Sequence, residues 1–320
     1  MLFDILKYPS KLALRIYCRK LQISDKKWLS HSGPLLLASN HPNSFLDAII
    51  LATIFKRPVY SLARGDTFKN KFIAKILYAI NILPVYRLSE GAENLNSNYD
   101  TFAKCREIFK KNGIVLIFSE GLCINEWKLR SLKKGTARLA FSSWQEGIDL
   151  TILPVGINYH SFKAFGKNVH LNFGTPFGKD EFDYQNMDGN GIKAFNEKLK
   201  NELTPLVEVI EHHDKEKLKS TFEINHHPIK KKALLLPAFI GKWIHAPIYK
   251  PIENFTRKKA GKSDHFDSIL VGLLFLLYPL YLAAIAAALY LWLGSWYWLL
   301  TFVTLPLLAW SYTQLSKQFH

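Results

Sequence analysis

The sequence predicts an α/β domain with a mostly parallel sheet flanked by helices, followed by a C-terminal transmembrane helical hairpin. Apolar runs of strand length lie at residues 35–39, 59–62, 114–119, 150–157 and 170–173. Stretches with helical spacing separate them, at residues 47–55, 69–80, 98–111 and 135–146. Strands that alternate with helices are typical of a parallel sheet with helices packed on its faces. We therefore expect the chemistry in the loops at the carboxyl ends of the strands.

The C-terminal part of the chain has a membrane composition. Residues 268–316 contain no Asp, Glu, Lys or Arg. A helix that crosses a bilayer needs about 20 apolar residues. Residues 268–293 meet this length, whereas residues 296–312, beyond the Gly294-Ser295 break, are at its lower limit. We expect two transmembrane helices or a re-entrant half-hairpin over residues 267–316.

Charge indicates an anionic partner. The chain has 42 Lys and Arg against 26 Asp and Glu, a net charge of +16. Such a balance fits a nucleic acid or an anionic membrane surface, and no zinc-ligand spacing, basic heptads or RNA-binding aromatic motif is present. Residues 226–266 interleave cations with apolar and aromatic residues, which favours a membrane surface over a solvated linker. The positive-inside rule then places the catalytic domain on the cytoplasmic face of an integral membrane protein. We expect no nucleic-acid partner.

The N-terminal residues 1–25 read as an amphipathic interfacial helix, although Pro9 favours a break and an ordinary domain-capping helix is the alternative. The α/β domain then covers residues 26–225. Three scattered cysteines, Cys18, Cys105 and Cys123, give neither a disulfide framework nor metal spacing. A reducing compartment is the expected setting.

A histidine and an aspartate lie where the first predicted strand gives way to a helix. His41 falls in the turn, Asn43 or Ser44 is a natural N-cap, and Asp47 falls in the first helical turn. A carboxylate bonded to one ring nitrogen leaves the other nitrogen as a general base. The pairing requires His41 to stay outside the helix, because six positions on a continuous helix separate two side chains by about 120°. A structural histidine beside a helix cap is the alternative.

Further polar residues follow later strands. Glu120 and Gly121 come at the end of the strand 114–119, where a carboxylate could accept hydrogen bonds from a polyol. The cations that precede the next helix are Lys128, Arg130, Lys133 and Lys134. Cations beside a helix N-terminus suit a phosphate, and a solvated basic face is the alternative. Arg87 ends the segment 82–87, and Pro154 interrupts the fourth strand.

In this order, the four motifs resemble the lysophospholipid and glycerol-phosphate acyltransferase family, over roughly residues 30–180. Its first block matches Asn40, His41 and Asp47, and its second block ends in an Arg, matched by Arg87. Its third block matches Phe118, Glu120 and Gly121, followed by Lys133 and Gly135 at the same distance. Its fourth block is an apolar strand with a proline, matched by Pro154.

The resemblance implies the site residues. His41 and Asp47 are then catalytic, and the substrate-binding residues are Asn43, Ser44, Arg87, Glu120, Gly121, Arg130, Lys133 and Pro154. Five residues between His and Asp, in place of the usual four, are similar to the branch that acylates glycerol-3-phosphate or dihydroxyacetone phosphate in yeast. Ser119 replaces the usual Pro, and Leu122-Cys123 replaces a Thr-Arg pair, so part of the acceptor site differs and Arg130 is the candidate to compensate.

The expected activity is transfer of a fatty acyl group in phospholipid biosynthesis. The donor is acyl-CoA or acyl-carrier protein, the acceptor is glycerol-3-phosphate or 1-acylglycerol-3-phosphate, and membrane lipids are further partners. No metal and no bound cofactor is expected. Three alternatives stay open: another lysolipid acceptor such as a lyso-aminolipid, a non-catalytic lipid-binding protein, and covalent transfer through Cys123 activated by His41.

Overall fold

A computed structural model describes residues 2–86, 96–185, 188–211 and 213–319. Its centre is a seven-stranded sheet in the order β1-β7-β6-β2-β5-β3-β4. The strands are β1 (Cys18–Ile23), β2 (Leu35–Ser39), β3 (Val59–Arg64), β4 (Ile82–Val85), β5 (Ile114–Phe118), β6 (Thr151–Tyr159) and β7 (Lys167–Phe173). Every neighbouring pair is parallel except β6 and β7. The predicted mostly parallel sheet is confirmed.

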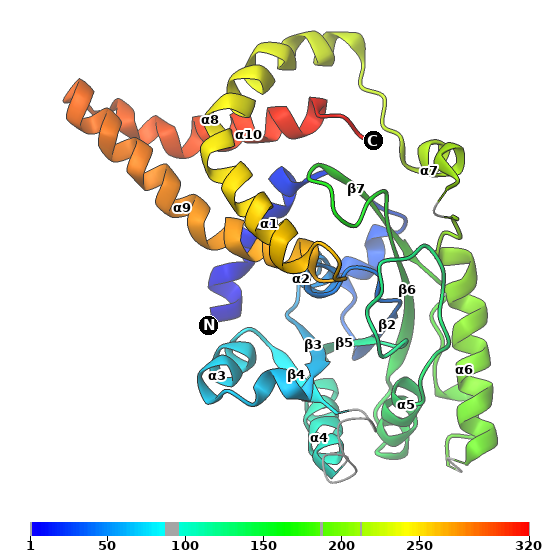
Figure 1. Ribbon diagram of the computed structural model, residues 1–320. Coiled ribbons are helices and arrows are strands. Elements are labelled where there is room, and N and C mark those ends of the chain that lie inside the picture. The colour runs from blue at the N-terminus through cyan, green and yellow to red at the C-terminus, as the bar shows by residue number, and fades with distance from the viewer. Residues whose placement is uncertain (1, 87–95, 186–187, 212, 320) are drawn as a thin grey trace.

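Helices cover both faces of the sheet (Figure 1). They are α1 (Leu2–Tyr17), α2 (Phe45–Ile54), α3 (Lys71–Ala79), α4 (Asn96–Lys110), α5 (Gly135–Gln145), α6 (Gly189–Leu203), α7 (Lys215–Phe222), α8 (Pro228–Ala260), α9 (Phe266–Leu293) and α10 (Thr301–Leu315). Leu35 and Leu37 of β2 face a core shared with α1, α2 and the start of α9. Leu36 and Ala38 face a second core formed with α4, α5 and α6. Both faces of this central strand are thus buried, as its continuous apolar run predicts.

Three central strands end at the same edge of the sheet. Ser39, the last residue of β2, is in register with Phe118 of β5 and with Val155 of β6. Because these strands are parallel, the loops that follow β2 and β5 open on one side, next to the end of β6. The first and third motifs of the sequence are therefore brought together.

The N-terminal boundary differs from the prediction. Helix α1 is continuous through Pro9 but ends at Tyr17, and Cys18–Ile23 is an edge strand that pairs with β7. The expected interfacial helix over residues 1–25 is therefore wrong beyond Tyr17, and the sheet begins before residue 26. Strand β1 carries Arg19, Lys20 and Gln22, so its composition lacks the apolar run that marks the other strands.

The C-terminal helices pack on one another and on the sheet. Helix α8 is continuous over 33 residues although it contains Pro237, Pro247 and Pro251. A side chain at Gly241 of α8 would lie 2.2 Å from the carbonyl oxygen of Leu308 in α10, so glycine permits the close packing of these two helices. Figure 1 shows α9 and α10 projecting together away from the sheet.

Among the described helices, α9 alone is long and apolar enough to cross a membrane, judged by length and composition. Its 28 residues extend about 42 Å. Helix α10 has 15 residues and extends about 22 Å. Its C-terminal end returns to the sheet, where the buried Arg19 of β1 donates hydrogen bonds to the carbonyl oxygens of Thr313 (3.1 Å) and Ser316 (2.7 Å).

Candidate active site

The turn after β2 is fixed to the sheet by Asn40. Its buried side-chain amide donates to the carbonyl oxygen of Ile157 (3.0 Å) and accepts the Ile157 N–H (2.8 Å). This two-way contact continues the pairing of β2 with β6 by one residue. The backbone position at which His41 follows β2 is therefore fixed relative to β6.

His41 and Asp47 are in contact, as the spacing argument requires. The distance from His41 Nδ1 to Asp47 Oδ2 is 2.9 Å, with His41 in the turn and Asp47 in the first turn of α2. The side chain of Asp47 is fully buried, and that of His41 is 18% exposed. The predicted geometry of the pair is therefore present.

The surroundings of Asp47 decide which nitrogen of His41 is available for proton transfer. Asp47 also accepts the N–H of Asn43 (2.8 Å) and the hydroxyl of Tyr159 (2.7 Å). A carboxylate that already accepts two hydrogen bonds is an acceptor for the third contact as well, so Nδ1 carries the hydrogen. Nε2 is then the nitrogen that carries the free lone pair.

Residues from β5 and the loop after it hold the histidine in place. The ring of Phe118 stacks on the ring of His41, with centroids 3.7 Å apart and planes 12° apart. Glu120 accepts the N–H of His41 (2.8 Å) and the N–H of Arg130 (2.7 Å). Burial raises the pKa of Glu120, and these two N–H groups act in the opposite direction. The observed contacts of Glu120 are thus with the backbone, and its predicted contact with a polyol stays a prediction.

Asn43 and Ser44 differ from the expected helix cap. Ser44 occupies the N-cap position, but its φ is 51° and its side chain makes no capping hydrogen bond. Its Oγ lies 2.7 Å from Nδ1 of His265, and the buried amide of Asn43 donates to Asp267 (2.6 Å). Both side chains face the start of α9, because that segment packs directly on the turn.

The predicted phosphate ligands are only partly brought together. Arg87 lies outside the described residues. The guanidinium of Arg130 is 2.5 Å from Glu126. Lys133 is exposed, and its side chain crosses over Gly121, where a Cβ would lie 3.0 Å from Lys133 Cγ. Gly121 has a φ of 65°, a conformation that favours glycine.

Pro154 lies inside the sheet. It is buried and in register with Ala38 of β2. A buried position in a central strand leaves little surface for a ligand, so its burial argues against the predicted substrate contact. The same strand contributes to the site further along, through Ile157, the partner of Asn40, and Tyr159, the partner of Asp47.

Cys123 is poorly suited to covalent transfer. Its Sγ accepts the N–H of Ser44 at 3.0 Å. Burial, and then the nearby carboxylate of Asp47, raise the pKa of the Cys123 thiol well above its ordinary value. The thiolate is the nucleophilic form of cysteine, and this environment disfavours it. Direct transfer to a substrate hydroxyl therefore fits the site better than an acyl-cysteine.

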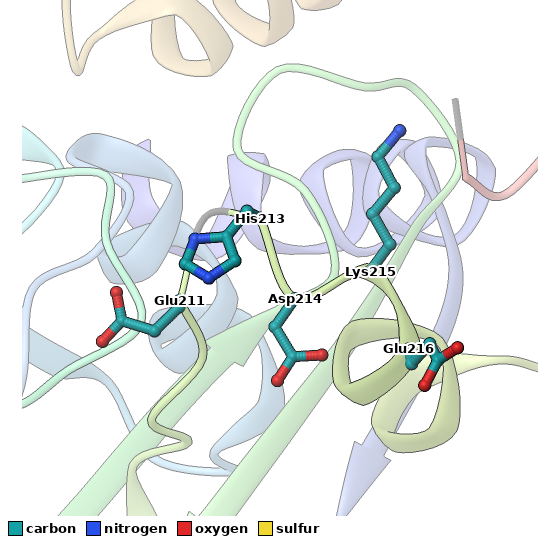
Figure 2. Close-up of a pocket in the computed structure, with 5 residues that line it drawn as sticks. All are labelled: Glu211, His213, Asp214, Lys215 and Glu216. Atoms are coloured by element: carbon teal, nitrogen blue, oxygen red, sulfur yellow. The ribbon is translucent and has the colours of Figure 1, made fainter.

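A pocket elsewhere in the described part of the chain contains none of the predicted site residues. Figure 2 shows a surface pocket lined by Glu211, His213, Asp214, Lys215 and Glu216. These residues come from one stretch before and at the start of α7, which contains none of the predicted site residues. Within the described ranges, no group of three or more His, Cys, Asp or Glu side chains could hold a metal ion.

Comparison with known proteins gives the same assignment as the motifs. Residues 20–158 match the family model named Acyltransferase, a range that includes His41, Asp47 and Glu120 and stops one residue before Tyr159. This part of the chain is therefore similar to the Acyltransferase family.

Two acyltransferases are similar to parts of this chain. The chloroplastic 1-acyl-sn-glycerol-3-phosphate acyltransferase LPAT1 of Arabidopsis thaliana is 26% identical over 127 residues, which are 40% of this chain and 34% of LPAT1. The match thus spans about a third of the length of that relative. The crystal structure of the 1-acyl-sn-glycerophosphate acyltransferase PlsC from Thermotoga maritima aligns with a TM-score of 0.40 at 15% identity, over 61% of this chain and 76% of that one.

Proposed function

We propose that this protein is an O-acyltransferase that moves a fatty acyl group from acyl-CoA or acyl-carrier protein to a hydroxyl of a glycerol-phosphate acceptor. The observation that carries the proposal is the hydrogen bonding of Asp47. Asn43 and Tyr159 both donate to this buried carboxylate, so His41 meets it through an Nδ1–H. Nε2 of His41 is thereby held as a base with its proton-accepting lone pair directed away from Asp47.

The reaction proceeds by direct transfer. Nε2 of His41 takes the proton of the acceptor hydroxyl while the oxygen attacks the thioester carbonyl carbon. The tetrahedral intermediate collapses, the carbon–sulfur bond breaks, and the departing thiolate takes the proton from His41. Asp47 stabilises the imidazolium that exists between these two proton transfers. Acceptor and donor are the only reactants, and the proposal includes no metal and no bound cofactor.

The phosphate of the acceptor is proposed to bind beside the Glu120–Gly121 turn. Lys133 is exposed there, and its ammonium is a flexible point charge suited to a phosphate. Arg87, at the end of the second motif, is the second proposed phosphate ligand. Glycerol-3-phosphate and 1-acylglycerol-3-phosphate are the proposed acceptors, and LPAT1 and PlsC are both named for the second of these substrates.

The protein is proposed to be anchored in a membrane through α9, with its catalytic domain on the cytoplasmic face. Other exposed apolar residues support contact with a bilayer. Ile5, Tyr8 and Leu12 share one face of α1 and are 64%, 78% and 53% exposed. On α3, Phe72 and Ile76 are 72% and 41% exposed. The nine cations of residues 226–266 would lie near anionic headgroups.

The experiment uses membranes from cells that express the full chain, washed with alkaline carbonate. Membranes with the wild-type protein are expected to transfer label from acyl-CoA or acyl-carrier protein to at least one acceptor in a panel of glycerol-3-phosphate, 1-acylglycerol-3-phosphate and lyso-aminolipid. His41→Ala should lower this rate by at least about 10³-fold, because the base is lost. Equal rates for both proteins would contradict the role of His41 as the base, and loss of the protein from the washed pellet would contradict anchoring.

A further inference from the structure

The start of helix α9 contacts the catalytic turn, although more than 220 residues separate them along the chain. Ser268 Oγ accepts the N–H of Phe45 (3.0 Å), and His265 Nδ1 lies 2.7 Å from Ser44 Oγ. Asp267 accepts from the side chain of Asn43 at 2.6 Å. The segment His265–Ser268, here called the α9 clamp, thus touches three consecutive residues of the turn.

The turn needs such support because its backbone is strained. Ser44 has a φ of 51°, which is uncommon for any residue other than glycine. Conformations of this kind cost about 1–3 kcal/mol and persist only where surrounding contacts impose them. Three successive N–H groups, of Asn43, Ser44 and Phe45, are taken by Asp47, Cys123 and Ser268. One of these three acceptors therefore belongs to the clamp.

Asp267 is itself firmly held. Its carboxylate is fully buried and lies 2.5 Å from the fully buried ammonium of Lys167. It also accepts the hydroxyl of Tyr17 at 2.7 Å. Removing one partner of a buried ion pair is strongly destabilising. The clamp is thus fixed to α1 and β7. Its hydrogen bond with Asn43 therefore holds that side chain in place.

The N–H of Asn43 is the link to the chemistry. This group donates to the same oxygen of Asp47 that meets His41 Nδ1. A turn that relaxed at Asn43–Phe45 would displace Asp47 from His41, since all of these residues lie within seven positions. A displacement of about 1 Å can cost about 10²-fold in rate.

We propose that Ser268 and Asp267 are positioning residues for the transfer reaction, and that the membrane helix α9 is for this reason a part of the active site. The inference rests on the proposed function. It predicts that the rate of the chemical step depends on the contacts of the α9 clamp with the turn, although no residue of α9 takes part in proton transfer. Anchoring and catalysis would then be coupled through one hydrogen-bonded segment.

The test compares three serine variants in the full-length, membrane-bound protein. Ser268→Ala removes the acceptor for the N–H of Phe45 and should lower kcat about tenfold, with the KM values for donor and acceptor unchanged within about twofold. Ser268→Thr restores the hydroxyl and should restore kcat. The matched control is Ser311→Ala, which removes a hydroxyl that bonds within α10 to the Leu307 carbonyl oxygen and should leave kcat and KM unchanged.

Asp267→Asn is the second arm. It keeps the size of the side chain but removes its charge, and it should lower kcat by about 10²-fold in the fraction that folds. Asp267→Asn leaves Lys167 without its anionic partner and so can fail to fold. In that case the Ser268 variants still test whether the clamp positions the turn. Wild-type kcat in Ser268→Ala, or a loss of kcat that Ser268→Thr fails to restore, would overturn the inference.

The outcomes also separate the two proposals. A wild-type protein that transfers no acyl group to any acceptor would overturn the proposed function, and the inference with it. An active wild-type protein that loses activity in His41→Ala but not in Ser268→Ala would keep the proposed function and reject the clamp.

Discussion

At the scale of single residues, Tyr159 is a member of the site that the sequence motifs do not mark. It is the last residue of β6, it is fully buried, and its hydroxyl donates to Asp47 Oδ1. Burial and the neighbouring Asp47 raise the pKa of Tyr159 well above its ordinary value. The phenol therefore stays protonated and acts as a permanent donor to the carboxylate.

The variant Tyr159→Phe tests this role. It leaves one oxygen of a buried carboxylate without its donor, which costs about 1–3 kcal/mol. We expect kcat to fall about tenfold and the melting temperature to fall by a few degrees. Tyr60→Phe, a matched change at a half-buried position on β3, should leave kcat unchanged. Wild-type kcat in Tyr159→Phe would show that Asp47 does not need this donor.

The difference between predicted and missed residues follows from distance along the chain. His41 and Asp47 are six residues apart, so the geometry of one turn and one helix start is enough to bring them together. Tyr159 and Asp267 reach the same turn from 112 and 224 residues away. Their placement depends on the order of strands in the sheet and on how α9 packs, which local patterns do not contain.

At the scale of elements, the apolar central strands could be predicted from the sequence, whereas the edge strand β1 could not. Strand β2 was expected at residues 35–39 and is found there, because its apolar run is buried on both faces. Strand β1 has no continuous apolar run, so its sequence instead predicts the end of the N-terminal helix. Helix α6 ends at Leu203, just before Pro205, and α7 begins only at Lys215. Proline cannot continue a helix beyond its first turn without loss of a hydrogen bond.

A buried histidine, His160, directly follows β6 of the antiparallel β6–β7 pair and makes stability depend on pH. His160 Nδ1 accepts the N–H of Asn168 at 2.9 Å, so the ring is neutral. Burial, with Lys167 and Arg19 nearby, lowers the pKa of His160 from its ordinary 6.5 to about 3. The unfolded chain then binds a proton below pH 6.5 that the folded chain does not bind. Stability is therefore lost as the pH falls from about 6.5 toward 3.

The size of this effect can be measured with His160→Gln, which keeps a polar side chain but does not titrate. Between pH 6.5 and pH 5, the wild-type protein is expected to lose about 2 kcal/mol more unfolding free energy than the variant. Thermal unfolding in detergent at a series of pH values gives the comparison. Identical pH dependence in the two proteins would mean that His160 does not remain neutral in the folded state.

At the scale of the whole molecule, the apolar helices are joined to the catalytic domain at both ends. The start of α9 holds the catalytic turn through Asn43, and the end of α10 is held by Arg19 of β1. Gln318, beyond α10, also accepts a hydrogen bond from Asn168 of β7 at 2.7 Å. The proposed membrane anchor is thus built into the sheet and is not a flexible tether.

In the proposed mechanism, His41 acts as the base because Asp47 holds its other nitrogen. The most direct measurement is kcat for acyl transfer by Asp47→Asn beside the wild-type protein, with equal amounts of folded protein in the same membranes. An amide can present its N–H to Nδ1 and so place the hydrogen on Nε2, which removes the base. We expect kcat to fall by about 10³–10⁴-fold. A value of kcat within tenfold of the wild-type value would contradict it.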